Sequence, residues 1–193
     1  MSLPAFTVFD TETTGLDPRR GDRIIEIAGV RVENGTIVTD KVFSELVNPE
    51  RSIPWEAARI HKIKDEDVAS APTVDLVLPK FLEFAKGSIL VAHNADFDMG
   101  FLEREKECCW GYVEIPECLC TMRLSQALFP KEFRHNLDVL YMRLGLTLPK
   151  DRHRAMPDVL LAAQALVKMI GYGKIGSIDQ LRKMAGNGVV TKM

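Results

Sequence analysis

The sequence has no long apolar run, no basic amino-terminal leader and no repeated or low-complexity segment. None of its 193 residues lies in a stretch of eighteen consecutive apolar side chains, so no membrane span is expected. The opening MSLPAF has no basic stretch followed by an apolar core, so no secretory signal is expected and the expected compartment is the cytoplasm. The length suits one domain with a full hydrophobic core.

Cysteine is scarce, and its spacing is unusual. The four cysteines are Cys108, Cys109, Cys118 and Cys120. Adjacent and one-apart spacings do not match the two-to-four-residue gap of common zinc sites, so zinc is the less favoured alternative. Reduced thiols, some of them buried, are expected instead.

A surplus of basic charge is also absent, since the net charge is −2. A protein that holds nucleic acid by general electrostatic attraction usually carries such a surplus. Any role with nucleic acid therefore needs a local site, where metal ions or a small basic cluster face the phosphates. Arg152, Arg154 and Arg134 are candidates for that cluster, and a solvated surface patch is the alternative.

The apolar pattern predicts an α/β fold around a mixed sheet. An antiparallel meander is expected from strands at 5–10, 23–33 and 36–47, because Asn34-Gly35 is a strong hairpin signal. Helical spacing then alternates with a short buried strand at 88–91. The expected helices are 74–85, 97–107, 121–129, 136–144, 156–170 and 177–185. Strands followed by alternating helix and strand indicate a single α/β layer fold.

Two carboxylates stand at the end of the first apolar run, in FTVFDTETTG. Alternate residues of a strand point to the same side, so Asp10 and Glu12 would project from one face. Two anions so close are unfavourable unless something positive lies between them. The alternative is that the strand has already ended and both are solvated turn residues.

Asp98, Asp158 and His153 lie where other expected elements begin or end. Asp98 follows a buried strand in HNADFD, whereas His153 and Asp158 belong to HRAMPD at the start of a helix rich in alanine and leucine. Each acid could simply cap its helix, worth about 0.5–1 kcal/mol, and His153 could be an exposed loop residue. A strand end, a strand-to-helix turn and a helix start can nevertheless converge, and four carboxylates meeting there would need counter-ions.

Such a cluster suits hard divalent cations, because Mg²⁺ and Mn²⁺ take oxygen ligands. Two ions about 3.5–4 Å apart can hold the attacking and leaving oxygens of an in-line phosphoryl displacement. A neutral imidazole nearby could take the proton from the attacking water.

The stretches FDTETTG, HNADFD and HRAMPD resemble, in this order, the three exonuclease motifs of the DnaQ-like superfamily in its DEDDh branch. The resemblance spans roughly residues 5–170 and extends to epsilon-type proofreading subunits of bacterial DNA polymerase III and to the exonuclease X group. It implies a ribonuclease-H-like mixed sheet, an antiparallel meander plus parallel strands flanked by helices. The exonuclease domain is then expected over 1–172, with 173–193 as a short helical extension of it.

The resemblance also implies a metal-dependent 3′–5′ exonuclease that releases nucleoside 5′-monophosphates from single-stranded DNA, with two Mg²⁺ or Mn²⁺ ions as cofactors. In this assignment Asp10 bridges both metals, Glu12 and Asp158 are further ligands, Asp98 is the fourth acid and His153 is the general base. The implied partners are single-stranded 3′ ends, DNA before RNA, and a DNA polymerase subunit, with no membrane.

Five more residues are implied to bind the terminal nucleotide. Glu56 and His61 would contact it, Thr13 and Leu16 would meet it through backbone and apolar contact, and Phe97 would pack against it. The apolar pair Leu16 and Phe97 could stack on bases without reading them. The alternatives are core packing for Phe97, a solvated loop for His61 and a plain helical position for Glu56.

Two rival functions remain at this point. An RNA-trimming exonuclease similar to RNase T or oligoribonuclease would share the chemistry, since no residue reveals the preferred sugar. A catalytically inactive nucleic-acid-binding module would need a lost ligand or a lost base, and none is missing from the sequence.

Overall fold

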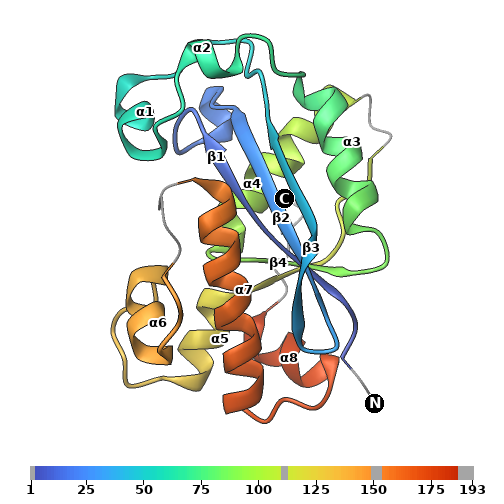
Figure 1. The fold of residues 1–193 in the computed structure, drawn as a ribbon, viewed down its shortest axis with the longest axis vertical. Coiled ribbons are helices and arrows are strands. Elements are labelled where there is room, and N and C mark those ends of the chain that lie inside the picture. The colour runs from blue at the N-terminus through green and yellow to red at the C-terminus, as the bar shows by residue number, and fades with distance from the viewer. Residues whose placement is uncertain (1–2, 110–112, 149–153, 187–193) are drawn as a thin grey trace.

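The structure, a computed structural model, describes residues 3–109, 113–148 and 154–186. Its centre is one five-stranded mixed sheet in the order β3-β2-β1-β4-β5 (Figure 1). The strands are β1 (Phe6–Thr13), β2 (Ile24–Glu33), β3 (Thr36–Leu46), β4 (Ile89–Ala92) and β5 (Cys118–Cys120). The first three pair antiparallel, whereas β4 pairs parallel with both β1 and β5. The expected mixed sheet is confirmed, and β5 is a strand that the sequence pattern did not predict.

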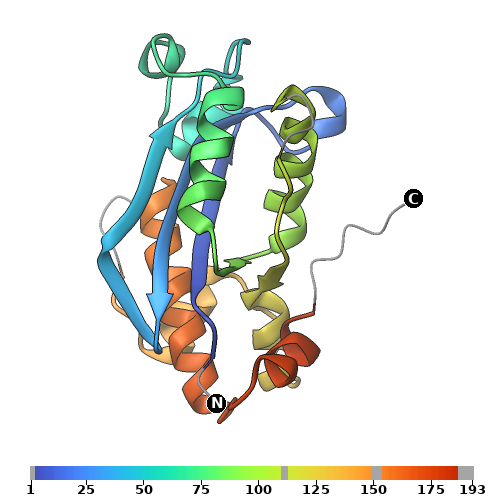
Figure 2. The same ribbon diagram turned by 90° about the vertical axis from the view of Figure 1, so that its right-hand side faces the viewer.

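Helices cover both faces of this sheet. The long helix α7 (Ala155–Tyr172) packs on β1 and β2, with α5 (Thr121–Leu128), α6 (Leu137–Leu144) and α8 (Ile178–Ala185) beside it. The opposite face carries α3 (Val74–Ala85) and α4 (Ala95–Glu105), which run next to each other in Figure 2. Two short helices, α1 (Trp55–His61) and α2 (Asp65–Val68), and two 3₁₀ turns, η1 (Pro18–Arg20) and η2 (Lys106–Cys109), complete the described elements.

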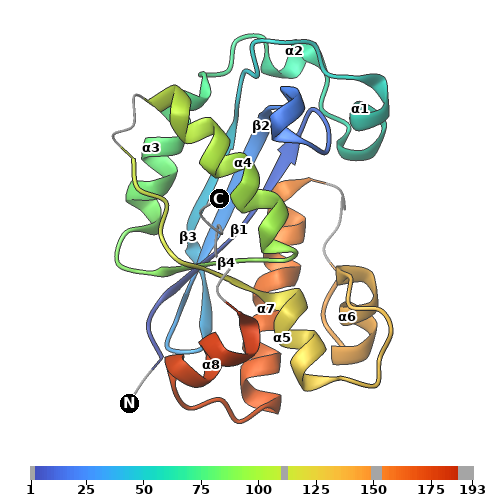
Figure 3. The ribbon, with the colours of Figure 1, turned by 180° about the vertical axis from the view of Figure 1, so that it is seen from behind.

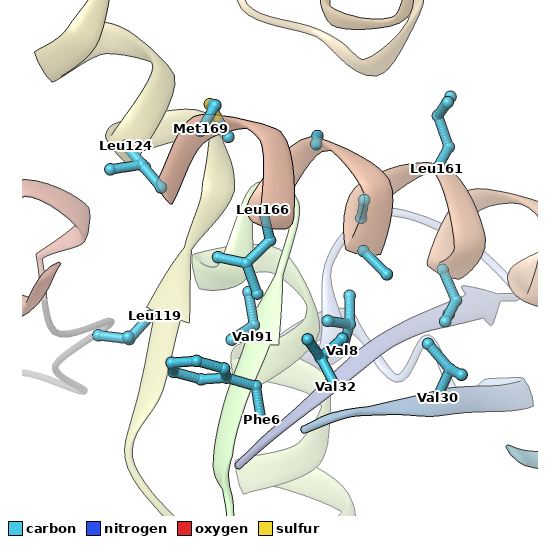
Figure 4. Close-up of a cluster of buried hydrophobic side chains, with 14 of the residues drawn as sticks. Phe6, Val8, Val30, Val32, Val91, Leu119, Leu124, Leu161, Leu166 and Met169 are labelled. Atoms are coloured by element: carbon cyan, nitrogen blue, oxygen red, sulfur yellow. The ribbon is translucent and has the colours of Figure 1, made fainter. Parts of the chain in front are cut away.

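The core is divided by the sheet into two main apolar layers. Phe6 and Val8 of β1 point into the layer under α7, where Figure 4 shows them near Leu166. Phe9 points into the opposite layer, against Phe81 of α3, with ring centroids 5.3 Å apart. This alternation follows from the two-residue period of a strand.

The same alternation places the two acids of β1. The strand continues through Asp10 and Glu12 to Thr13, so the alternative in which it ends before them is wrong. Asp10 and Glu12 have the parity of Phe6 and Val8 and therefore project on the α7 side, just beyond the apolar layer. The strand carries apolar residues for the core and then acids for the site.

The start of α7 lies beside this strand end. Pro157 occupies the third position of the helix, in its first turn, where a missing N–H costs nothing. Asp158 follows it and donates its backbone N–H to the Arg154 carbonyl oxygen at 3.4 Å.

The cysteines are all free thiols, with Cys108 exposed and the other three buried. No helix in the described ranges is long and apolar enough to span a membrane.

Candidate active site

The four predicted acids act on one another electrostatically. Asp10 is half-buried, and its pKa is raised well above the ordinary value of 3.8. Burial is the main cause, followed by the negative charges of Asp98, Glu12, Asp158 and the additional acid Glu26. Three motifs far apart in the sequence are thus brought to the carboxyl end of β1.

Glu12 is also half-buried, and its pKa is raised from 4.5 to about 8. Burial contributes most, then the charges of Glu26, Asp158 and Asp98, while Arg154 lowers it. Within the described residues Glu12 makes no ion pair and no hydrogen bond through its carboxylate. Its negative charge is therefore not compensated within this part of the protein.

Asp98 is held by Thr11, which lies between the two acids of β1. Asp98 is buried in the first turn of α4, and its Oδ1 accepts from the Thr11 backbone N–H at 3.0 Å and from the Thr11 hydroxyl at 2.8 Å. Burial raises its pKa to about 7, and the bonds from Thr11 oppose this rise. Thr11 has the opposite parity to Asp10 and Glu12, so it reaches α4 while they face α7. Its part in the site was not predicted from the sequence.

The start of α7 is fixed by Glu26, which the sequence reasoning also missed. The buried Glu26 carboxylate accepts from Arg154 Nη2 at 2.7 Å, from Arg154 Nε at 3.0 Å and from the Ala155 backbone N–H at 3.1 Å. Glu26 thus engages Nε and Nη2 of Arg154, and a contact of this arginine with upstream phosphates stays a prediction. A lone glutamate inside the apolar run IIEIAGV is the one local signal for such a buried pair.

His153, the expected general base, lies outside the described residues, as does Arg152. Arg154, the next residue after His153, is the one that Glu26 holds. The role of His153 therefore stays a prediction.

A cavity of about 440 Å³ opens beside Glu12. All five residues that the resemblance implied for nucleotide binding line it: Thr13, Leu16, Glu56, His61 and Phe97. Its lining is mostly apolar, with Ile60 and Ala57 of α1 among the walls. A partly apolar hollow with a few polar groups is the usual form of a small-ligand site.

His61 is buried rather than a solvated loop residue, so that alternative is wrong. Its Nδ1 accepts from the Ile63 backbone N–H at 3.0 Å, which places the proton of the neutral ring on Nε2. Burial lowers the pKa of the ring and so favours this neutral form. Nε2 is buried without a hydrogen-bond partner among the described residues. A donor is therefore left for a ligand in the cavity that His61 lines.

The other lining residues combine two roles. Phe97 is half-buried and contacts Phe101, with ring centroids 5.1 Å apart, so it packs on the core while lining the cavity. Glu56 does sit in a short helix, α1, and from there it reaches the cavity. Leu16 is 84% exposed and lines the same cavity, so its apolar side chain is accessible to a ligand there.

The turn after β1 depends on Gly15. Thr13 donates its hydroxyl to the Gly15 carbonyl oxygen at 2.6 Å, and a Cβ atom at position 15 would collide with the Asp22 carboxylate. Asp22 in turn accepts from the Asp17 backbone N–H at 3.1 Å. Close packing against Asp22 therefore requires glycine in this turn.

The carboxylate oxygens of these acids are suitable ligands for a hard divalent cation, although the side chains do not form a complete coordination site. Across residues 3–109, 113–148 and 154–186, no three Asp, Glu, His or Cys side chains are gathered closely enough to hold a metal as they stand. The four carboxyls nevertheless repel one another enough to contribute to the raised pKa of Asp10. Carboxylate oxygens are the ligands that Mg²⁺ and Mn²⁺ prefer, and a cation would relieve this repulsion.

Comparison with known proteins shows the family of the chain. The pattern of the family described as Exonuclease matches residues 7–166. A DNA polymerase III subunit epsilon-like protein of Rhodobacter capsulatus is 45% identical over 166 residues, which cover 86% of this chain but only 23% of that protein. A DNA polymerase III subunit epsilon of Rickettsia conorii is 37% identical over 183 residues, covering 92% of this chain and 78% of the relative.

Solved structures agree with this match. Exonuclease X, in complex with 5′ overhanging duplex DNA, is 32% identical with a TM-score of 0.75, covering 94% of this chain and 99% of that one. The nuclease domain of 3'hExo, a DEDDh family member bound to rAMP, has a TM-score of 0.74 at 21% identity, covering 88% and 92% of the two chains. At that lower identity the likeness concerns the fold, and it confirms the expected ribonuclease-H-like architecture.

Proposed function

This chain belongs to the exonuclease family and is a 3′–5′ exonuclease domain, and from this premise we propose that it removes nucleoside 5′-monophosphates from the 3′ end of single-stranded DNA. The observation that carries the proposal is the meeting of four mutually repelling carboxyls with a nucleotide-sized cavity at the end of β1. Enzymes of this family generally use divalent metal ions. Here Asp10, Glu12, Asp98 and Asp158 would hold two of them, Mg²⁺ or Mn²⁺.

Bound divalent ions would supply the positive charge that a phosphodiester under attack requires. Residues of the chain would supply the proton transfer and hold the acids in position. His153 takes the proton from the attacking water, and the Glu26–Arg154 pair holds the start of α7 next to it. Thr11 keeps Asp98 at the strand end.

The cavity accounts for action at an end rather than within a strand. A free 3′-hydroxyl is both a donor and an acceptor. The Glu56 carboxylate can accept from it, and the Nε2–H of His61 can donate to it. Leu16 and Phe97 pack on the terminal base without reading its edge, which gives a sequence-tolerant grip.

The physiological setting follows from the relatives. Because relatives covered over most of their length are named DNA polymerase III subunit epsilon, association with a polymerase subunit is part of the proposal. The preference for DNA over RNA is also part of it.

The test uses a 5′-labelled single-stranded oligodeoxynucleotide with the purified chain in Mg²⁺, in Mn²⁺ and in EDTA. We expect a ladder that shortens from the 3′ end and releases nucleoside 5′-monophosphates, with no hydrolysis in EDTA. Internal fragments, or turnover in EDTA, would contradict the proposal. A matched RNA oligomer should be hydrolysed more slowly, and faster hydrolysis of RNA would favour the RNA-trimming alternative.

A further inference from the structure

The cavity beside Glu12 is built mostly from two walls that come from different parts of the chain. One wall is the turn after β1, which contributes the residues from Thr13 to Leu16 and, at its far end, Asp22. The other wall is α1, together with Pro54 before it. Both walls lie at the same end of the sheet (Figure 3). Because van der Waals contacts weaken steeply with distance, the affinity for a nucleotide between the walls depends on their separation.

The turn after β1 is held at its base and at its far end. Thr14 donates its backbone N–H to the Arg23 carbonyl oxygen at 2.8 Å, and its hydroxyl oxygen accepts from the Arg23 backbone N–H at 3.0 Å. The Asp22 carboxylate accepts from the Asp17 backbone N–H at 3.1 Å and from the Thr14 hydroxyl at 3.4 Å. The shape of this wall therefore depends on Asp22.

The α1 wall rests on a small apolar cluster, separate from the two main layers of the core. Ala57 and Ala58 of α1 pack against its buried members, which are Ile25, Ile53, Ile63 and Val68. Pro54 stands at the N-cap of α1 and provides no side-chain hydrogen bond there. Apolar contacts are not directional, so a polar contact is needed to fix α1 at one distance from the turn.

Arg51 makes a polar contact of this kind. It stands three residues before Pro54, on the segment that leads into α1. Its Nη1 donates to Asp22 Oδ1 at 3.2 Å and also to the Gly21 carbonyl oxygen. The Asp22 side chain is only 18% exposed, so this charge-assisted bond is less screened than one on the open surface. The guanidinium also offsets the negative charge of Asp22, which would otherwise repel a phosphate near the cavity.

We propose that Arg51 is a positioning residue, which holds α1 and the turn after β1 at the separation that the terminal nucleotide requires. Arg51 lies outside the lining of that cavity and lines a neighbouring hollow of about 390 Å³, so it acts through Asp22 and Gly21. The proposal rests on the proposed function, because the terminal nucleotide must bind between these walls. Since Thr11 and Glu26 hold Asp98 and the start of α7 by other contacts, Arg51 should affect affinity rather than the chemical step.

Affinity for the reaction product tests this role directly. The probe is thymidine 5′-monophosphate, and calorimetry in Mn²⁺ measures its Kd. We expect Arg51→Ala to raise this Kd, and the KM for a single-stranded oligodeoxynucleotide, by about 5- to 30-fold, with kcat changed less than about twofold. Arg51→Lys should retain most of the affinity, because a single nitrogen makes both contacts and an ammonium group can donate in its place.

Arg104→Ala is the matched control. Arg104 is also exposed and lines the same hollow as Arg51, but it pairs with Glu107 and contacts neither wall of the nucleotide cavity in the described part of the chain. The substitution removes the same charge, so Kd and KM should stay within about twofold of the wild-type values. In both alanine variants the melting temperature should fall by no more than about 4 °C, as for the loss of an exposed ion pair.

Two results would overturn the role of Arg51. An unchanged Kd for thymidine 5′-monophosphate in Arg51→Ala would do so, and a rise confined to the KM of the oligonucleotide would mean that Arg51 contacts an upstream phosphate instead. Equal effects of Arg51→Ala and Arg104→Ala would reduce the contribution of Arg51 to net charge alone.

Amide hydrogen exchange without ligand separates this role from the proposed function. Arg51→Ala should speed exchange several-fold in peptides that cover 14–22 and 55–61, and should leave β4 unchanged. Unchanged exchange in both peptides would refute the contact as the link between the walls. If exchange rises as expected but the wild-type protein binds no thymidine 5′-monophosphate, the proposed function fails while Arg51 still fixes the two walls.

Discussion

Two glutamates face each other across one rung of the β1–β2 ladder, and their surroundings differ completely. Glu12 and Glu26 are paired in the register, so both side chains lie on the same face of the sheet. Glu26 receives three hydrogen bonds, two from the Arg154 guanidinium and one from the Ala155 backbone. Glu12 receives none among the described residues, and its pKa rises to about 8.

A second buried glutamate shows that the difference follows a rule. Glu105 of α4 accepts from Arg23 Nε at 2.9 Å and from the Ile24 backbone N–H at 3.0 Å. In both structural cases the fold gives the acid an arginine and a backbone N–H. Within the described ranges, neither the Asp10 nor the Glu12 carboxylate receives a hydrogen bond from an arginine or from a backbone N–H. A protein that compensates its structural acids in this way leaves others uncompensated where an external cation is expected.

The largest expected effect comes from removing one uncompensated acid. Asp10→Asn should abolish hydrolysis, because the substitution removes a proposed metal ligand, while the melting temperature in EDTA should rise as carboxylate repulsion is relieved. Product release from a labelled oligonucleotide and thermal unfolding measure the two effects. Asp96→Asn is the matched control, since Asp96 is exposed on the same site-bearing helix as Asp98 and pairs with Arg123. Near-normal turnover by Asp10→Asn would refute the metal assignment.

The next effect concerns the expected general base. His153→Ala should slow hydrolysis by about 10²–10⁴-fold at neutral pH, the usual contribution of a positioned base. Because the imidazole must be neutral to accept a proton, the acid limb of the pH–rate profile should disappear in the variant. A variant that keeps the wild-type profile would contradict this role.

The contrast between the glutamates also explains what the sequence could and could not reveal. Asp10, Glu12, Asp98 and Asp158 stand in short motifs at the ends of regular elements, so the resemblance of these motifs to a known family was enough to single them out. Glu26 stands inside a strand, and its partner Arg154 is 128 positions away, a contact that no local pattern encodes.

The fold shows the same limit. The first strand was predicted to end at Asp10, but pairing with β2 carries it to Thr13, because a backbone ladder can extend through polar residues. The strand β5 was missed because three residues are too few for a periodic signal, and it exists through its parallel pairing with β4. Thr11 was missed because its function depends on which face of β1 meets α4.

The same substitution on the two glutamates sharpens the comparison further. Glu26→Gln should lower the free energy of unfolding by about 1.5–3 kcal/mol, because charge-assisted bonds to Arg154 and Ala155 are weakened. Glu12→Gln should instead raise it in EDTA, because an uncompensated charge is removed. Urea unfolding of both variants measures the two signs. Changes of the same sign would show that the fold does not distinguish the two acids.

The smallest effect is a dependence of stability on pH that a divalent ion should remove. The pKa of Glu12 rises from 4.5 to about 8, and the pKa of Asp98 rises from 3.8 to about 7, so the folded state binds these protons more tightly than the unfolded chain. In EDTA the stabilisation is therefore complete below about pH 4 and is lost as the pH rises through 7 to 8.

With Mn²⁺ or Mg²⁺ present, the ionised acids gain a cation, so the loss of stability at high pH should be offset. The melting temperature should rise on the order of a few °C at pH 8 and much less at pH 5. Scanning calorimetry at both pH values, with and without EDTA, measures this difference. Glu12→Gln should reduce both the slope in EDTA and the gain from metal, whereas Asp96→Asn, which alters an exposed acid paired with Arg123, should leave both unchanged. An equal rise in melting temperature at the two pH values would mean that the cation binds elsewhere. A cation that binds these acids must displace their protons, so its effect has to depend on pH.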